Sequence, residues 1–192
     1  MKAFKNRTVA VLLAAVLVIG STLISASAAL KNDMKKVTNG FYTGALYDGE
    51  KTTDVPDASQ SIYKQLTVIT AKVDNICAVA AANEVESEAL KDASYYLKSN
   101  LSSMHEFVCS IYWSYDELCQ ALTEIKPKLN KAELTDAERE AINEDLLAIS
   151  EAQKVISESG YNESVRRYKS SMNAFEEFVA DVCGIYGPEF FS

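Results

Sequence analysis

Apolar side chains recur at alternating intervals of three and four residues, and this rhythm limits the possible folds of the chain more than any other feature. The longest faultless stretch comprises Leu101, Met104, Val108, Ile111, Tyr115, Leu118, Leu122 and Ile125, and it extends backward through Leu97 and Ala93. A 3.5-residue repeat holds one narrow stripe of a helix against the same neighbour. It predicts long helices that pack nearly parallel or antiparallel to one another.

The same repeat lies on both sides of that stretch. An earlier stripe contains Ile62, Leu66, Ile69, Val73, Ile76 and Ala80, and a later one contains Ile142, Leu146, Ile149, Gln153 and Ile156. After a phase slip near Gly160, apolar positions resume at Val165, Tyr168, Met172, Phe175, Val179, Val182 and Tyr186. Helix-breaking residues are scarce between residues 57 and 183, where only Pro127 and Gly160 occur, and this scarcity favours long helices.

Short breaks divide this region. Residues 83–87 and 127–134 are the expected turns, and turns of this length place consecutive helices side by side and antiparallel. Thr135 and Glu138 have the spacing of a capping box, which predicts a helix start. Helix propensity is weakest at Ser159-Gly160, where we expect a kink or a break. The predicted fold is all-α: an elongated antiparallel bundle of three or four helices, with coiled-coil-like packing, over residues 57–192.

The first 28 residues resemble an export signal. Lys2, Lys5 and Arg7 precede an apolar run over residues 9–19, and Ala26-Ser27-Ala28 fits a signal-peptidase site. We expect cleavage after Ala28, which would give an extracytoplasmic protein, either secreted or held in the cell envelope. The alternative is that this segment is retained and anchors the protein in the membrane.

Residues 29–56 predict a linker or a small irregular cap. Asn39-Gly40 and Asp48-Gly49 are dipeptides typical of hairpin turns, and short apolar-aromatic pieces flank them. A small hairpin is the structure that this pattern favours.

The charge balance limits the partners. The formal charge is −8, and loss of the signal segment would leave 16 basic residues against 27 acidic ones. Because such a chain has no general attraction for phosphate backbones, we expect no nucleic-acid partner.

Residues that could carry chemistry are few. Cys77, Cys109, Cys119 and Cys183 would lie at least about 15 Å apart along straight antiparallel helices, whereas a disulfide needs Cα atoms within about 7 Å. Packed thiols are therefore expected, with a disulfide permitted by a kink at Gly160 and intermolecular pairing as alternatives. His105 lies four residues before Cys109, but the chain has no second histidine and no Cys-x-x-Cys. We expect no metal site, no cofactor and no catalytic residue.

The aromatic residues point to an interaction surface. Tyr112 and Trp113 lie off the apolar stripe, so they either form an exposed patch or close the bundle against a further helix.

The last third of the chain contains Tyr161-Asn162-x-x-Val165-x-x-Tyr168-x-x-x-Met172-x-x-Phe175 and closes in Pro188-Glu189-Phe190-Phe191. This pattern resembles the C-terminal signature of the LemA family of bacterial envelope proteins, although the family usually repeats Tyr-Asn where this chain has Tyr168-Lys169. The resemblance implies an extended antiparallel helical bundle behind an N-terminal membrane segment.

These observations together predict an exported, non-enzymatic scaffold or interaction protein of the bacterial cell envelope, whose partner is an envelope or membrane protein or a second copy of the chain. The candidate contact residues are Tyr112, Trp113, Tyr161, Asn162 and Tyr168. Two alternatives stay open: a small-ligand binder with a pocket near Gly160, and a thiol-dependent redox protein.

Overall fold

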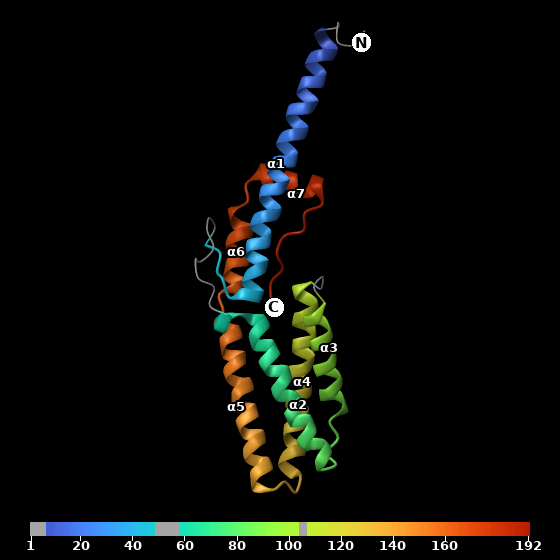
Figure 1. Cartoon of the computed structure of the whole chain (residues 1–192), viewed down its shortest axis with the longest axis vertical. Coiled ribbons are helices and arrows are strands. Elements are labelled where there is room, and N and C mark those ends of the chain that lie inside the picture. Colours follow the sequence, from blue (N-terminus) through green and yellow to red (C-terminus); the bar gives the residue numbers. More distant parts are fainter. Residues whose placement is uncertain (1–6, 49–57, 104–106) are drawn as a thin grey trace.

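The computed structural model describes residues 7–48, 58–103 and 107–192, and the all-α prediction is confirmed. Within these ranges the chain forms α1 (Arg7–Thr43), the 3-10 helix η2 (Ala58–Gln60), α2 (Ile62–Ala82), α3 (Glu88–Ser102), α4 (Val108–Lys131), α5 (Asp136–Glu158), α6 (Tyr161–Ser171) and α7 (Ala174–Cys183). The molecule is elongated, and the N-terminal end of α1 projects from it (Figure 1).

Helices α2 to α5 form a four-helix part at one end of the molecule. Helix α2 packs against both α3 and α5, and α3 packs against α4 (Figure 1). The predicted stripe residues supply its core, and the fully buried ones include Leu66, Ile69, Val73, Ile76, Ala80, Leu97 and Leu118. The prediction of an antiparallel bundle built on a 3.5-residue repeat therefore holds for this part of the chain.

The longest predicted stripe belongs to two helices. Helix α3 ends at Ser102 and α4 begins at Val108, so the chain reverses within the run from Ala93 to Ile125. Leu97 and Ile111 are nevertheless both buried, because each helix of the hairpin turns its stripe toward the same core. The prediction of a single helix between the turns at 83–87 and 127–134 was wrong. The repeat identifies core positions but does not reveal whether the chain continues straight between them.

The predicted helix start at Thr135 is confirmed. Thr135 Oγ1 accepts a hydrogen bond from the Glu138 backbone N–H at 3.3 Å, and the Glu138 carboxylate accepts one from the Thr135 N–H at 2.8 Å. Residues 83–87 form the expected turn between α2 and α3. The second turn is shorter than predicted, because α4 continues past Pro127 to Lys131.

Helix α1 replaces most of the predicted linker. It runs unbroken to Thr43, so the expectation of an irregular segment is wrong for residues 29–43. Gly40 lies inside this helix. The chain folds back directly after the helix, so a Cβ on Gly40 would come within 2.4 Å of the Ala45 carbonyl oxygen. Its need for a glycine is steric and has nothing to do with a hairpin. Gly49 lies outside the described residues.

The predicted break at Gly160 is real. Gly160 has φ +70° and separates α5 from α6, which packs on α1. A second break, at Met172-Asn173, was missed: Asn173 Oδ1 accepts from the backbone N–H groups of Phe175 and Glu176 and starts α7 in a new direction. Beyond this break only Val179 of the last predicted stripe is fully buried. Phe175, Val182 and Tyr186 are exposed.

Candidate functional site

The Tyr-Asn motif holds the C-terminal segment, residues 184–192. The Asn162 side-chain amide donates to the Phe191 carbonyl oxygen at 2.9 Å, and Asn162 Oδ1 accepts from the Phe191 N–H at 2.8 Å. The Tyr161 hydroxyl donates to the Glu189 carbonyl oxygen at 2.9 Å. Two consecutive side chains at the start of α6 therefore pair with the backbone of a segment that lies almost thirty residues later.

Phe191 joins three parts of the molecule. Its ring lies against Phe41 of α1 and against Tyr112 and Tyr115 of α4, with centroid separations of 5.7, 5.2 and 5.6 Å. The neighbouring Glu189 carboxylate accepts from the backbone N–H of Cys109 in the first turn of α4, a position where a helix end attracts negative charge. The C-terminal segment thereby connects the four-helix part to α1 and α6.

Burial shows that the junction, where the C-terminal segment meets α1, α4 and α6, is structural. Tyr161 and Tyr168 are 2% and 3% exposed, and the Tyr168 hydroxyl donates to the Leu30 carbonyl oxygen of α1. Burial, the larger cause, and the nearby Glu189 raise the pKa of Tyr161, which keeps its phenol protonated. The prediction that Tyr161 and Tyr168 offer a contact surface is therefore wrong. The Asn162 side-chain amide is hydrogen-bonded to the Phe191 backbone.

The other predicted contact residues differ in their exposure to solvent. Tyr112 is half-buried against Phe191, so it belongs mainly to the junction. Trp113, one residue later, is 67% exposed on α4. Tyr95 and Tyr96 on α3 are exposed as well, and their rings contact each other edge to face. Of the predicted residues, Trp113 alone presents most of its side chain to solvent.

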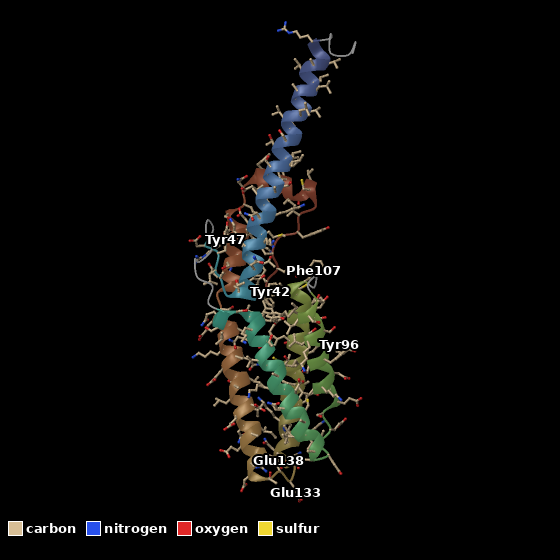
Figure 2. The ribbon with its side chains drawn as sticks, in the orientation of Figure 1. Tyr42, Tyr47, Tyr96, Phe107, Glu133 and Glu138 are labelled. Atoms are coloured by element: carbon tan, nitrogen blue, oxygen red, sulfur yellow. The ribbon has the colours of Figure 1, made fainter. Side chains whose placement is uncertain are left out.

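A groove lies between α1, the C-terminal segment and the start of α4, with an open volume of about 510 Å³. Met34, Thr38, Phe107 and Tyr186 line it, and Lys31 and Lys35 stand along α1 at its edge. A narrower recess continues from it toward Tyr42, which lies across the junction from Phe107 (Figure 2). The groove is apolar with amines at its edge, which suits an apolar or amphipathic ligand better than a reacting polar substrate.

The residues that line the groove were not predicted from the sequence. Phe107 stands directly before α4, and Tyr186 follows the glycine that ends α7. Gly184 was a visible signal for that helix end, because its φ of +61° is the usual conformation after a helix. At Gly160 the Leu46 side chain packs closely and leaves only 3.3 Å to an added Cβ.

Three of the four cysteines are half-buried, and Cys183 is exposed. All four are free thiols, and burial is the main cause that raises the pKa of Cys77, Cys109 and Cys119. A raised pKa lowers the fraction of reactive thiolate. Among the described residues no group of three or more His, Cys, Asp or Glu side chains could hold a metal ion. His105 lies outside the described residues.

The N-terminal half of α1 is the most unusual surface of the molecule. Val11, Leu12, Val16, Leu17, Val18, Ile19 and Ile24 are each at least 60% exposed, and they point to all sides of the helix. By length and composition α1 could cross a membrane, and a signal sequence would meet the same criteria. From Leu30 onward the same helix enters the core, where Val37 and Phe41 are fully buried. Comparison of the chain with protein-family models, with curated proteins and with solved structures gave no match.

Proposed function

We propose that this chain is a membrane-anchored, non-enzymatic helical scaffold of the bacterial cell envelope, similar in organisation to the LemA family. Residues 9–29 of α1 cross the bilayer, and the bundle stands outside the cytoplasm as an interaction module. The partner is an envelope protein or a second copy of the chain.

One observation carries the proposal: a single continuous helix is apolar and exposed all round in its first half and packs one side against the protein core in its second half. Residues 9–29 extend about 31 Å at 1.5 Å per residue, which matches a hydrocarbon core of about 30 Å. So much apolar surface is unfavourable in water and favourable in lipid. The basic residues Lys2, Lys5 and Arg7 favour a cytoplasmic N-terminus, which places the acidic bundle outside.

Packing around the predicted cleavage site supports retention of the anchor. Leu23, Ala26 and Ser27 are half-buried, although Ile24 is 70% exposed. Helix α7 packs on α1 and crosses it at this level (Figure 1). Cleavage after Ala28 would remove part of the surface on which α7 lies.

The scaffold role is supported by what the bundle exposes. Tyr95, Tyr96 and Trp113 are large aromatic side chains of the α3–α4 hairpin that remain open to solvent, and aromatic residues dominate binding energy at protein interfaces. Interaction is therefore favoured over catalysis. Burial raises the pKa of the Cys77, Cys109 and Cys119 thiols, which weakens the thiol-dependent alternative for these three residues.

Membrane retention is tested with the full chain expressed in a bacterial host. We expect the protein to stay with the membranes after alkaline carbonate extraction, and its intact mass to include residues 1–28. A soluble product that begins at Ala29 would refute the anchor.

The interaction role is tested with a photo-crosslinking amino acid in place of Trp113. The same amino acid at Leu147, an equally exposed position on α5, is the matched control. We expect a discrete crosslinked species from position 113 only. Equal or absent crosslinking at the two positions would contradict an interaction surface on α4.

A further inference from the structure

Helix α7 exposes an apolar stripe that the core does not use. Phe175, Phe178 and Val182 are 48%, 55% and 59% exposed, and their spacing of three and four residues places them along one side of the helix. Glu177 lies on the other side of the helix. Amphipathic helices of this kind cover their apolar side with a protein or with lipid.

The position of α7 relative to α1 indicates which. In Figure 1, α7 lies across α1 at the level where the exposed apolar part of α1 ends and the buried part begins. If residues 9–29 span a bilayer, this level is one of its two surfaces. A helix that lies across the anchor there is parallel to the membrane plane.

The direction of the stripe follows from helix geometry. Val179 is fully buried and α1 is the packing partner of α7, so Val179 faces α1. Successive residues are turned by about 100°, so Phe178 and Ala180 point to opposite sides of Val179. Ala180 is half-buried and shares its side with Glu176. Burial is the main cause that raises the pKa of Tyr47 and Tyr168, and the charge of Glu176 adds a smaller contribution to both. Tyr47 lies on the bundle side of α7 (Figure 2). Phe178 therefore points away from the bundle, toward the exposed half of α1, and Phe175 and Val182 lie between the directions of Val179 and Phe178.

We propose that α7 is an interfacial membrane helix whose apolar stripe, Phe175, Phe178 and Val182, inserts into the bilayer surface beside the α1 anchor. This inference rests on the proposed membrane anchor and adds a second lipid contact to it. Helix α7 has three carboxylates, Glu176, Glu177 and Asp181, and no basic residue. Apolar insertion must therefore drive the contact, and anionic lipid is not needed.

The test uses the full chain in phosphatidylcholine vesicles that contain phosphatidylcholine brominated on its acyl chains. Bromine quenches tryptophan only at close range, and Trp113 is the single native tryptophan. In a Trp113→Phe background, Phe175→Trp reports on the stripe and Glu177→Trp reports on the opposite side of the same helix. The native chain, with Trp113 on α4, is a control for an anchored but distant tryptophan.

We expect Phe175→Trp to be quenched about twofold or more, because an interfacial helix buries its apolar face about 5–10 Å into the bilayer. Glu177→Trp and native Trp113 should be quenched much less, and addition of anionic phosphatidylglycerol should change nothing. Val182→Trp in the same background is a second reporter on the stripe and must agree with Phe175→Trp if α7 keeps its fold.

Vesicle flotation after carbonate treatment separates the two proposals. Protein that fails to float refutes the anchor. Floating protein in which stripe and opposite-side reporters are quenched equally, or not at all, refutes the interfacial helix while the anchor stands. If a second copy covers the stripe instead, the stripe tryptophans are unquenched by bromine and crosslinking through the exposed Cys183 gives a dimer, which also overturns the proposal.

Discussion

Replacement of Asn162 by Ala tests whether the Tyr-Asn motif acts by holding the C-terminal segment. The substitution removes both hydrogen bonds to the Phe191 backbone. Each such bond contributes about 0.5–1.5 kcal/mol net, so we expect a loss of about 1–3 kcal/mol in the free energy of unfolding.

The sharper form of this prediction is a cycle with the segment deleted. A chain that ends at Gly187 lacks Phe191, so Asn162 has lost its partner. In that background Asn162→Ala should cost close to nothing, and the coupling energy should equal nearly the whole effect seen in the full chain. Truncation itself should cost more than Asn162→Ala, because it also removes the Phe191 ring from its contacts with Phe41, Tyr112 and Tyr115.

The measurement is urea unfolding of each variant in one mild detergent, followed by circular dichroism at 222 nm. Asn143→Ala, at an exposed position on α5, is the control for replacing an asparagine by alanine within a helix and should change little. If Asn162→Ala is equally destabilising with and without residues 188–192, then Asn162 acts within α6 and the assignment of the motif to the C-terminal segment is refuted.

Four further substitutions test other features of the structure. Gly160→Ala should lower the free energy of unfolding by about 1–2 kcal/mol because of its left-handed conformation, and further because Leu46 must move. At Gly184 an added Cβ meets no neighbouring atom, so Gly184→Ala should show only the conformational cost. Thermal melts measure both effects. The pKa of Glu138 is lowered by hydrogen bonds, first from the Thr135 hydroxyl and then from the Asn83 amide, so its stabilisation is full above the unfolded pKa and is lost as the pH falls through the folded one. Glu138→Gln should be less stable than the native chain at neutral pH and should flatten this acid dependence. Burial raises the pKa of Tyr161 above 10.0, so its contribution is full below about pH 10 and declines as the pH rises further. Tyr161→Phe should be less stable than the native chain at pH 7, because the Glu189 carbonyl loses its hydrogen-bond partner. Its free energy of unfolding, measured as a function of pH, should also decline less at alkaline pH. An unchanged alkaline profile would contradict a buried, protonated Tyr161.

The core of the four-helix part was predictable because burial repeats with a fixed period. Leu66, Val73, Leu97 and Leu118 were identified as core positions from spacing, and each is fully buried. The reversal between α3 and α4 was not predictable, because residues 102–107 contain neither Gly nor Pro and the repeat continues through them. Spacing determines which side of a helix faces the core, whereas the direction of the chain depends on contacts between residues distant in sequence.

The same distinction explains the results for the candidate site. The Tyr161-Asn162 motif was identified, but its partner is the backbone of Glu189 and Phe191, which no local pattern reveals. Asn173 and Glu176 did give a local signal, since they form a capping box that starts α7, and that signal would have separated Val165 and Tyr168 from the exposed residues that follow. Reading Phe175 and Val182 as core residues overlooked this cap.

If α1 spans the bilayer as proposed, its continuity constrains the part of the protein that packs on its second half. Residues 30–43 extend about 20 Å as helix beyond the proposed bilayer surface, with Val37 and Phe41 fixed in the core. Helix α1 continues without a break from the proposed anchor into the core, so its buried half cannot turn independently of the anchor. A second lipid contact through α7 would restrict rotation about the α1 axis as well. The groove beside Lys31 and Met34, and the aromatic residues of the α3–α4 hairpin, would then stand at fixed heights and directions from the membrane, an arrangement that favours a scaffold whose partners share the same membrane.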